Sequence, residues 1–211
     1  MKKILFLAVL LSVTVSVSAQ TYFNGARADY DLYYQSRWGF EAGVNLANVT
    51  PNANFETRHI TGFSAGFNLD APVSDSFSIM PALLYAQRGY QATTLSGNYS
   101  QRIQAVELPV LARFCLGNIV NFYVGPQLSY IVSASNSYSG NFPVAIRQYY
   151  EYDGANLSFQ GVGGAGFKIT KSFNIHARYS IDLTSTGANG RAQYVPTYRS
   201  HVFQMGFGIN I

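Results

Sequence analysis

The stretch from Glu107 to Tyr130 constrains the fold most, because its apolar residues recur at every second position. These positions are Leu108, Val110, Ala112 and Phe114 in a first run, and Phe122, Val124, Leu128 and Tyr130 in a second. Successive side chains of a strand point to opposite sides of a sheet. The Gly-Asn pair between the two runs is typical of a tight turn. The stretch therefore predicts a β-hairpin with one large apolar face and one small or polar face.

The same period of two recurs along most of the chain. Alternating runs lie near residues 37–47, 60–69, 77–89, 107–114, 122–132, 156–168, 173–184 and 200–211. Helical periodicity is missing, and beyond the N-terminus no apolar stretch has the length that a membrane-spanning helix needs. Pro81, Pro109 and Pro126 interrupt three of the runs, and we expect local bulges there. The pattern predicts an all-β chain of eight antiparallel strands.

The connections between these runs alternate in length. Residues 70–76, 115–120 and 169–172 are short connections, whereas residues 48–59, 90–101, 135–155 and 185–199 are longer and rich in Ser, Asn, Gly and Tyr. Outer-membrane barrels combine short periplasmic turns with longer extracellular loops. We therefore predict an eight-stranded antiparallel transmembrane β-barrel over residues 37–211. Cys115, the single cysteine, falls in a short turn and cannot form an intramolecular disulfide.

Two closures of such a sheet compete, a soluble lipocalin-like barrel with its apolar face inside and a membrane barrel with that face outside. Only 11% of the residues are charged, against about 25% in soluble domains. The interior of an eight-stranded barrel is just wide enough for side chains. The many Phe, Tyr, Leu and Ile side chains of the apolar face would overfill it. We therefore expect the apolar face to meet lipid.

The charged residues of the strands share the small, polar face. They are Glu41, Arg88, Glu107, Arg113, His176, Arg178 and Asp182. Since a lipid-facing Arg or Lys near the midplane costs about 2–4 kcal/mol, we predict that they form a lumenal polar cluster and pair with one another. His176 and Asp182 are six residues apart, about 20 Å along a strand, so each needs a partner from another strand.

The sequence gives little support for catalytic, metal or cofactor sites. The adjacent Ser200 and His201 point to opposite faces of a strand, so they cannot belong to one triad. Three scattered His residues and one Cys have no metal-ligand spacing. The glycine-rich run within 156–168 lacks a following helix and a P-loop lysine. We predict a protein that is not an enzyme and has no cofactor.

The N-terminus reads as a secretory signal. Lys2 and Lys3 precede an apolar run, and Val17-Ser18-Ala19 is a small-residue cleavage site. We expect residues 1–19 to be removed, residues 20–36 to form an irregular segment, and the product to reside in the bacterial outer membrane with its lipid as a partner. Cleavage lowers the formal charge from +4 to +2. With no basic stripe, nucleic acid is not an expected partner.

Five segments resemble a known family. In order they read WGFEAGVNLANV, SFSIMPALLYAQRGY, VELPVLARF, NFYVGPQLSY and the terminal FQMGFGINI. Together they resemble the PorT-like outer-membrane β-barrel domain common in Bacteroidetes, over residues 37–211. The resemblance implies the barrel fold and the outer-membrane location. It also implies a link to secretion, since the family's named member is associated with a secretion and gliding system.

Three functional classes remain open. The first is a structural or interaction barrel that presents Tyr-rich extracellular loops to a protein partner, because exposed aromatic side chains are effective contact anchors. The tyrosines in question are Tyr99, Tyr138, Tyr149, Tyr150, Tyr152, Tyr194 and Tyr198. The second is a small porin-like channel, for which eight strands leave little lumen. The third is a lipid-modifying barrel enzyme. We expect the first.

Overall fold

A computed structural model describes residues 35–50, 56–94, 97–117, 119–140, 157–170, 172–183 and 199–211. Its strands are β1 (Arg37–Thr50), β2 (Glu56–Ser74), β3 (Phe77–Thr94), β4 (Gly97–Leu116), β5 (Val120–Gly140), β6 (Leu157–Lys168), β7 (Phe173–Asp182) and β8 (Arg199–Asn210). The predicted signal peptide and residues 20–34 of the irregular segment lie outside the described residues. None of the described residues form a helix apolar and long enough to cross a membrane.

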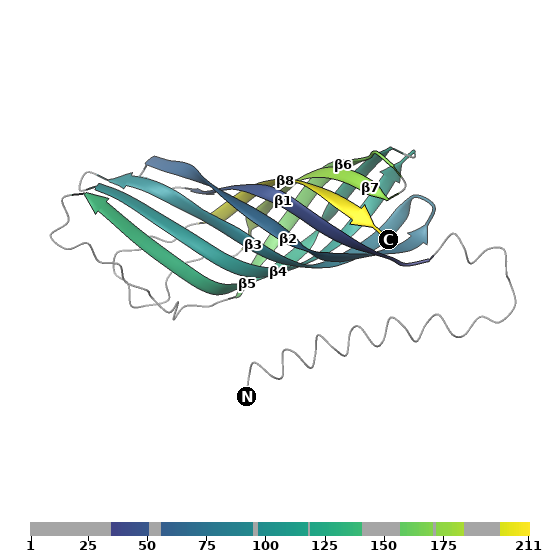
Figure 1. Ribbon diagram of the computed structural model, residues 1–211, viewed down its shortest axis with the longest axis horizontal. Helices are drawn as coiled ribbons and strands as arrows, with labels where there is room; N and C mark the ends of the chain where they lie inside the picture. The colour runs from purple at the N-terminus through teal and green to yellow at the C-terminus, as the bar shows by residue number, and fades with distance from the viewer. Residues whose placement is uncertain are drawn as a thin grey trace, which may run out of the picture. The chain divides into compact units, whose positions relative to one another are not determined.

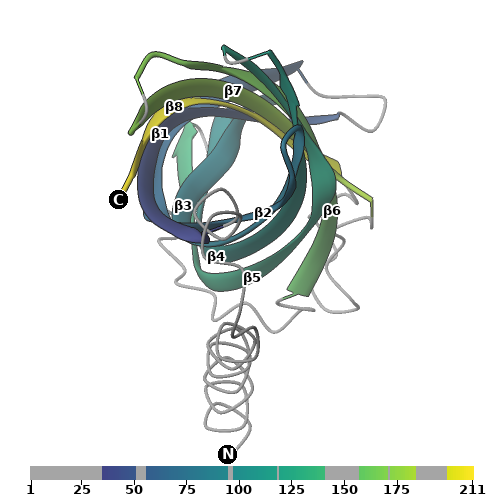
Figure 2. The same ribbon diagram turned by 90° about the vertical axis from the view of Figure 1, so that its right-hand side faces the viewer.

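The eight strands form one closed antiparallel barrel in which each strand pairs with its neighbours in the sequence (Figure 1). The ring is completed where the last strand meets the first, with Gly39 opposite Asn210 and Thr50 opposite Arg199. Figure 2 looks along the ring and shows β8 beside β1. The predicted fold class, an all-β eight-stranded antiparallel barrel, is confirmed.

Alternation along the strands separates two surfaces, as the sequence predicted. Large apolar side chains cover the outside, among them Phe67 at 62% exposure and Met205 at 58%, while inward Glu41 and Asp182 are 2% and 1% exposed. Aromatic rings on the outer face pair across strands, as Phe40 and Phe67 do with centroids 5.7 Å apart. A soluble protein would bury these rings and expose the charges. This barrel does the reverse.

The bulges predicted at Pro81, Pro109 and Pro126 are wrong. The ladder between β3 and β4 lapses between the pairs Pro81↔Val110 and Leu84↔Glu107 and then resumes in the same register. A proline removes one hydrogen-bond donor but adds no residue, so pairing can skip a step without a shift. The register shifts lie elsewhere, between His59 and Ser64, between Pro72 and Ser74, and between Gln104 and Ala105.

The predicted bounds of three long loops are also wrong. β1 continues to Thr50 and β2 begins at Glu56, inside the predicted loop 48–59. β3 continues to Thr94 and β4 begins at Gly97, so the predicted loop 90–101 is almost entirely strand. β5 continues to Gly140, into the predicted loop 135–155. Polar residues keep pairing there, with Tyr99 opposite Tyr138. The loss of apolar alternation therefore marks the end of the lipid-facing belt and not the end of the strand.

The turn between β4 and β5 is shorter than predicted. Cys115 lies in β4 opposite Asn121 and not in the turn. The turn begins at Gly117, whose φ of 64° lies in the left-handed region that favours glycine. We call this end of the barrel, where β2–β3, β4–β5 and β6–β7 are joined, the turn end, and the opposite end the loop end.

Depth in the membrane, rather than exposure alone, should decide the cost of a charge on the outer face. Leu128 lies centrally among the outward residues of β5, while Leu116 ends β4 at the turn end and is more exposed, at 68% against 40%. We expect Leu128→Arg to lower the free energy of unfolding in phospholipid vesicles by about 2–4 kcal/mol and Leu116→Arg by about 0–1. Urea titration followed by the fluorescence of Trp38 measures both. Equal losses would contradict a lipid-facing belt.

Candidate functional site in the barrel lumen

Glu41 and Arg178 form the tightest ion pair of the described lumen. Nη1 and Nη2 of Arg178 donate to Oε1 and Oε2 of Glu41 at 2.5 and 2.9 Å. Nδ2 of Asn68 donates to Oε2 of the same carboxylate at 3.0 Å. The three residues come from β7, β1 and β2, and all are buried. Two parallel charge-assisted hydrogen bonds fix the pair in one geometry, and the pair connects strands on both sides of β8.

Aromatic and imidazole groups surround Arg178. Its guanidinium carbon lies 5.3 Å from the centroid of the Tyr123 ring, in the range of a cation–π contact. The His176 ring meets the same tyrosine edge-on, with centroids 6.5 Å apart. Within the described residues neither His176 nitrogen has a hydrogen-bond partner. His176 therefore fills space beside the ion pair without joining its hydrogen bonds.

Glycines make room for these large inward groups. A Cβ at Gly206 would lie 3.0 Å from Nε2 of His176 and 2.6 Å from the carbonyl oxygen of Ala42. A Cβ at Gly166 would lie 3.0 Å from Cε2 of Tyr123. At Gly166 the carbonyl oxygen of Ile175 would also lie 2.7 Å from the Cβ. Contacts of 2.6–2.7 Å with backbone oxygens require the strand to shift, so both positions favour glycine.

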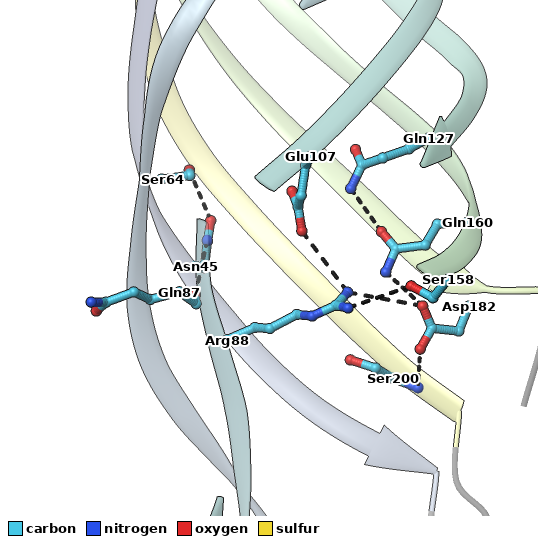
Figure 3. Close-up of polar contacts among 10 residues, drawn as sticks. All are labelled: Asn45, Ser64, Gln87, Arg88, Glu107, Gln127, Ser158, Gln160, Asp182 and Ser200. Atoms are coloured by element: carbon cyan, nitrogen blue, oxygen red, sulfur yellow. Dashed lines mark hydrogen bonds and ion pairs between the residues drawn. The ribbon is translucent and has the colours of Figure 1, made fainter. Parts of the chain in front are cut away.

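A second cluster is centred on Arg88 of β3 (Figure 3). Its Nη1 lies 3.9 Å from Oε1 of Glu107 and 3.9 Å from Oδ1 of Asp182. Its Nη2 lies 3.5 Å from the hydroxyl oxygen of Ser158. Since β3 and β7 lie on opposite sides of the ring, Arg88 reaches across the lumen. A cross-section that one arginine spans holds no wide channel.

Neutral amides extend this cluster. Gln127 donates to Oε1 of Gln160 at 2.7 Å, and Gln160 donates to Oδ1 of Asp182 at 2.5 Å (Figure 3). The backbone N–H of Ser200 donates to the other carboxylate oxygen of Asp182 at 3.1 Å. Asp182 is thereby held from β6 and β8 as well as from β3.

Two smaller polar groups complete the described lumen. Nη2 of Arg113 lies 2.7 Å from Oδ2 of Asp70. In a separate group, Ser64 of β2 donates to Asn45 of β1 at 3.1 Å, and Gln204 of β8 donates to Ser64 at 2.6 Å.

Apolar side chains fill the space between the polar groups. Met80, Leu111, Tyr123 and Val162 form one buried cluster, and Ile103, Ile131 and Ala134 another. Leu111 is only 1% exposed. The interior of the described barrel is packed with side chains of both kinds.

All seven residues of the sequence-derived polar cluster point into the barrel, and the structure divides them. Glu41 joins Arg178, and Arg88 lies between Glu107 and Asp182. Arg113 has Asp70 as its partner, and His176 has no ion pair among the described residues. The single network expected from the sequence is thus several groups, and each of their ion pairs apart from Arg88–Glu107 joins strands that are not neighbours in the barrel.

Sequence reasoning missed four polar partners. The sequence predicts a connection at Asp70, but this residue lies in β2 opposite Arg37, at the turn end. Asn68 and Gln127 were assigned to the polar face by their alternation, but uncharged amides were not proposed as cluster members. Gln160 lies in the glycine-rich run of β6. Both faces of this run carry small residues, so the alternation does not show which face points into the barrel. The alternation of inward and outward residues in β2 continues beyond Leu69, and this continuation would have placed Asp70 in the strand.

Among the described residues, the serine and histidine singled out from the sequence are not arranged for catalysis. Ser200 is buried in the lumen, while His201 stacks on Tyr179 of the outer face with centroids 6.3 Å apart. His176 has no hydrogen bond to a hydroxyl or a carboxylate in the described structure. The described residues also contain no group of three or more His, Cys, Asp or Glu side chains suited to a metal ion. The lumenal groups brace the strands.

The family of the chain follows from a comparison with protein-family models. The model of the outer membrane protein beta-barrel domain matches residues 15–187. The chain belongs to this family. Its inverted surface, apolar outside and charged within, is the one that an outer-membrane barrel requires, and the protein is accordingly one of the outer membrane. No curated protein matches the sequence.

Solved structures share the fold at low identity. Neisserial surface protein A (NspA) is 14% identical with a TM-score of 0.54, and the match covers 84% of this chain and 99% of that one. The attachment invasion locus protein Ail of Yersinia pestis, solved with the heparin analogue sucrose octasulfate, is 12% identical with a TM-score of 0.50, again covering 84% and 99%. Both likenesses concern the fold alone.

The Glu41–Arg178 pair should contribute strongly to stability. Glu41→Ala leaves a buried guanidinium without its carboxylate, and we expect a loss of about 3–5 kcal/mol in the free energy of unfolding. The double variant Glu41→Ala/Arg178→Met should lose less than Glu41→Ala alone, because no unpaired charge remains. Asp75→Ala, in the exposed β2–β3 turn, is the matched control. A Glu41→Ala loss no larger than the Asp75→Ala loss would contradict this role.

Proposed function

We propose that the protein is a non-enzymatic structural or interaction component of the outer membrane, which acts through its loop end. The observation that carries the proposal is the reach of Arg88 across the lumen to Asp182 on the opposite strand. A barrel braced in this way is a rigid support rather than a conduit. Its surface of contact with other molecules is then the rim.

The two other classes receive less support. A porin-like channel needs an aqueous path, whereas the three charged residues that meet across the lumen are buried, with Arg88 at 3%, Asp182 at 1% and Glu107 at 9% exposure. A lipid-modifying enzyme needs its reactive groups within reach of lipid. The charged residues singled out from the sequence instead lie in the lumen.

The uneven strand lengths favour contacts at the loop end. A membrane-spanning strand needs about 9–11 residues. β7 has 10 residues and β8 has 12, but β4 has 20 and β5 has 21. The surplus of β4 and β5 carries polar sequence with tyrosines at positions 99 and 138. The partner-binding tyrosines 149, 150, 152, 194 and 198 proposed from the sequence lie outside the described residues.

The PorT-like resemblance of residues 37–211 supports a proposal about the system to which the partner belongs. Since the family's named member is associated with secretion and gliding, we propose that the partner belongs to a secretion-related assembly of the same envelope.

A flux measurement tests whether the lumen is closed. We expect liposomes that contain the purified barrel to show no swelling in arabinose or glucose above that of empty liposomes, because Arg88, Glu107 and Asp182 occupy the cross-section. A general porin reconstituted in parallel shows that the assay detects conduction. Swelling comparable with that of the porin would overturn the proposal of a closed support.

Partner capture tests the interaction role. Replacement of residues 141–156 by a four-residue Gly-Ser linker should remove envelope proteins that the unaltered chain retains from detergent extracts, because this segment carries three of the seven tyrosines. Replacement of Asp75 and Ser76 in the β2–β3 turn by Gly-Gly is the control at the other end. Identical partner lists from all three chains would count against binding at the loop end.

A further inference from the structure

β5 extends well beyond the point at which its pairing with β6 ends. β6 pairs with β5 from Val120 to Tyr130, where Tyr130 lies opposite Leu157. On its other side β5 pairs with β4 as far as Gly140, opposite Gly97. Figure 1 shows the long β4 and β5 running past the ends of β6, β7 and β8. In the described structure, residues 131–140 of β5 thus have one paired neighbour and one open edge.

The open edge lacks two of the features that protect exposed edges, charge and proline. Natural edge strands are blunted by charged side chains, by proline or by being very short. Residues 131–140 read IVSASNSYSG and contain no charge and no proline over ten residues. Their unpaired backbone N–H and C=O groups are a template for another extended chain.

A register shift separates this edge from the barrel wall. Gln104 lies opposite Ser133, but the next residue of β4, Ala105, lies opposite Ile131, so that Val132 is an extra residue in β5. A bulge bends its strand and increases the local twist. It lies at the level where β6 stops pairing, so the extension of β5 begins with a bend.

The positive charge of Arg102 should make the open edge favour a partner with an acidic side chain. Arg102 is exposed, lies on β4 opposite Ser135, and its outward face continues over the small exposed residues Ser135 and Ser137 of β5. Neighbouring strands lie about 4.8 Å apart, so a strand added to β5 would lie roughly 10 Å from β4. An extended arginine side chain at position 102 is long enough to pass over Ser135 and meet an acidic side chain on such a strand. Cross-strand pairs of opposite charge stabilise a sheet.

A second copy of the barrel does not fit this edge. Two copies in one membrane share their orientation, so a two-fold axis relating them runs along the membrane normal. Strands of such barrels are tilted by about 35–45°, and the two β5 strands would therefore cross at about 70–90°. Strands that cross at such angles cannot form a ladder. The edge needs a segment that is free to align with β5.

We propose that the open edge of β5, from Ile131 to Gly140, binds an extended peptide segment of a partner protein by strand addition, with an acidic side chain of that segment facing Arg102. Main-chain hydrogen bonds supply affinity in this mode of recognition, and side-chain contacts supply specificity. The inference rests on the proposed interaction function and names the site and the chemistry of the partner.

Fluorescence anisotropy with the mature chain in detergent micelles tests the charge preference. The probe is a labelled nine-residue peptide of alternating Thr and Val with Glu at its centre, flanked by Gly-Ser for solubility. We expect saturable binding that Arg102→Glu weakens at least tenfold. The same variant should bind the matching peptide with central Lys more tightly than the unaltered chain does.

Arg58→Glu is the matched control, because Arg58 is also exposed but lies on β2, which β3 and β4 separate from β5. Its affinity for the Glu peptide should stay within twofold of the unaltered value. Equal losses from Arg58→Glu and Arg102→Glu would indicate attraction to the net charge alone and would overturn the site.

Backbone-methylated peptides test strand addition on the unaltered protein. N-methylation at the odd-numbered amides blocks one edge of the peptide, and methylation at the even-numbered amides blocks the other. Strand addition predicts that one of these two peptides binds like the parent and that the other does not bind. Equal binding of both, or loss of both, would overturn the inference.

Two further outcomes distinguish the possible failures. Peptide binding that appears only after residues 141–156 are replaced by a Gly-Ser linker would show that the chain covers its own edge, and would overturn the inference. Absence of peptide binding by a barrel that conducts no solute would overturn this inference alone. Solute flux would instead overturn the proposed function.

Discussion

The structure depends on one constraint, that each charge on a membrane-crossing strand must find its partner inside a lumen barely wider than its own side chains. Lipid offers no hydrogen bonds on the outer side. Glu41 and Arg178 satisfy the constraint most completely, with two short charge-assisted hydrogen bonds. They lie on β1 and β7, on either side of β8. The pair therefore braces the seam at which the two ends of the sheet meet.

This constraint also explains the glycines and the lack of an open lumen. Large inward groups such as Tyr123, His176 and Arg88 fit only if other inward positions have no side chain. Gly166 and Gly206 lie directly against the rings of Tyr123 and His176. A lumen that is filled in this way supports the proposed contact at the rim, as does the length of β2 to β5, each of 18 or more residues in the described structure.

The sequence predicted the fold and, for nearly every strand residue, whether its side chain points inward or outward. This was possible because side chains alternate between the two faces of a strand, and the choice of apolar or polar residue follows the same alternation. Charge placement was equally predictable, since a charge on the lipid face is costly. The partners of the charges were not. Arg178 reaches Glu41 past an intervening strand, and Arg88 crosses the ring, so both pairings depend on tilt and register between strands far apart in the sequence.

The positions at which the strands end could not be predicted from the sequence either. Apolar alternation stops where lipid stops, but backbone pairing continues between polar residues such as Tyr99 and Tyr138. This difference conceals the extension of β4 and β5, and with it the open edge. Similarly, Asp70 appeared to lie in a connection because Pro72 follows it, although β2 continues to Ser74.

The direction of the two faces can be measured along β7. In a Cys115→Ser background, single cysteines at positions 174–181 would carry a fluorophore, and brominated lipids would quench it in vesicles. The structure predicts strong quenching at 175, 177, 179 and 181 and weak quenching at 174, 176, 178 and 180. Quenching with the opposite phase, or without a period of two, would contradict a barrel whose apolar face meets lipid and whose charges face inward.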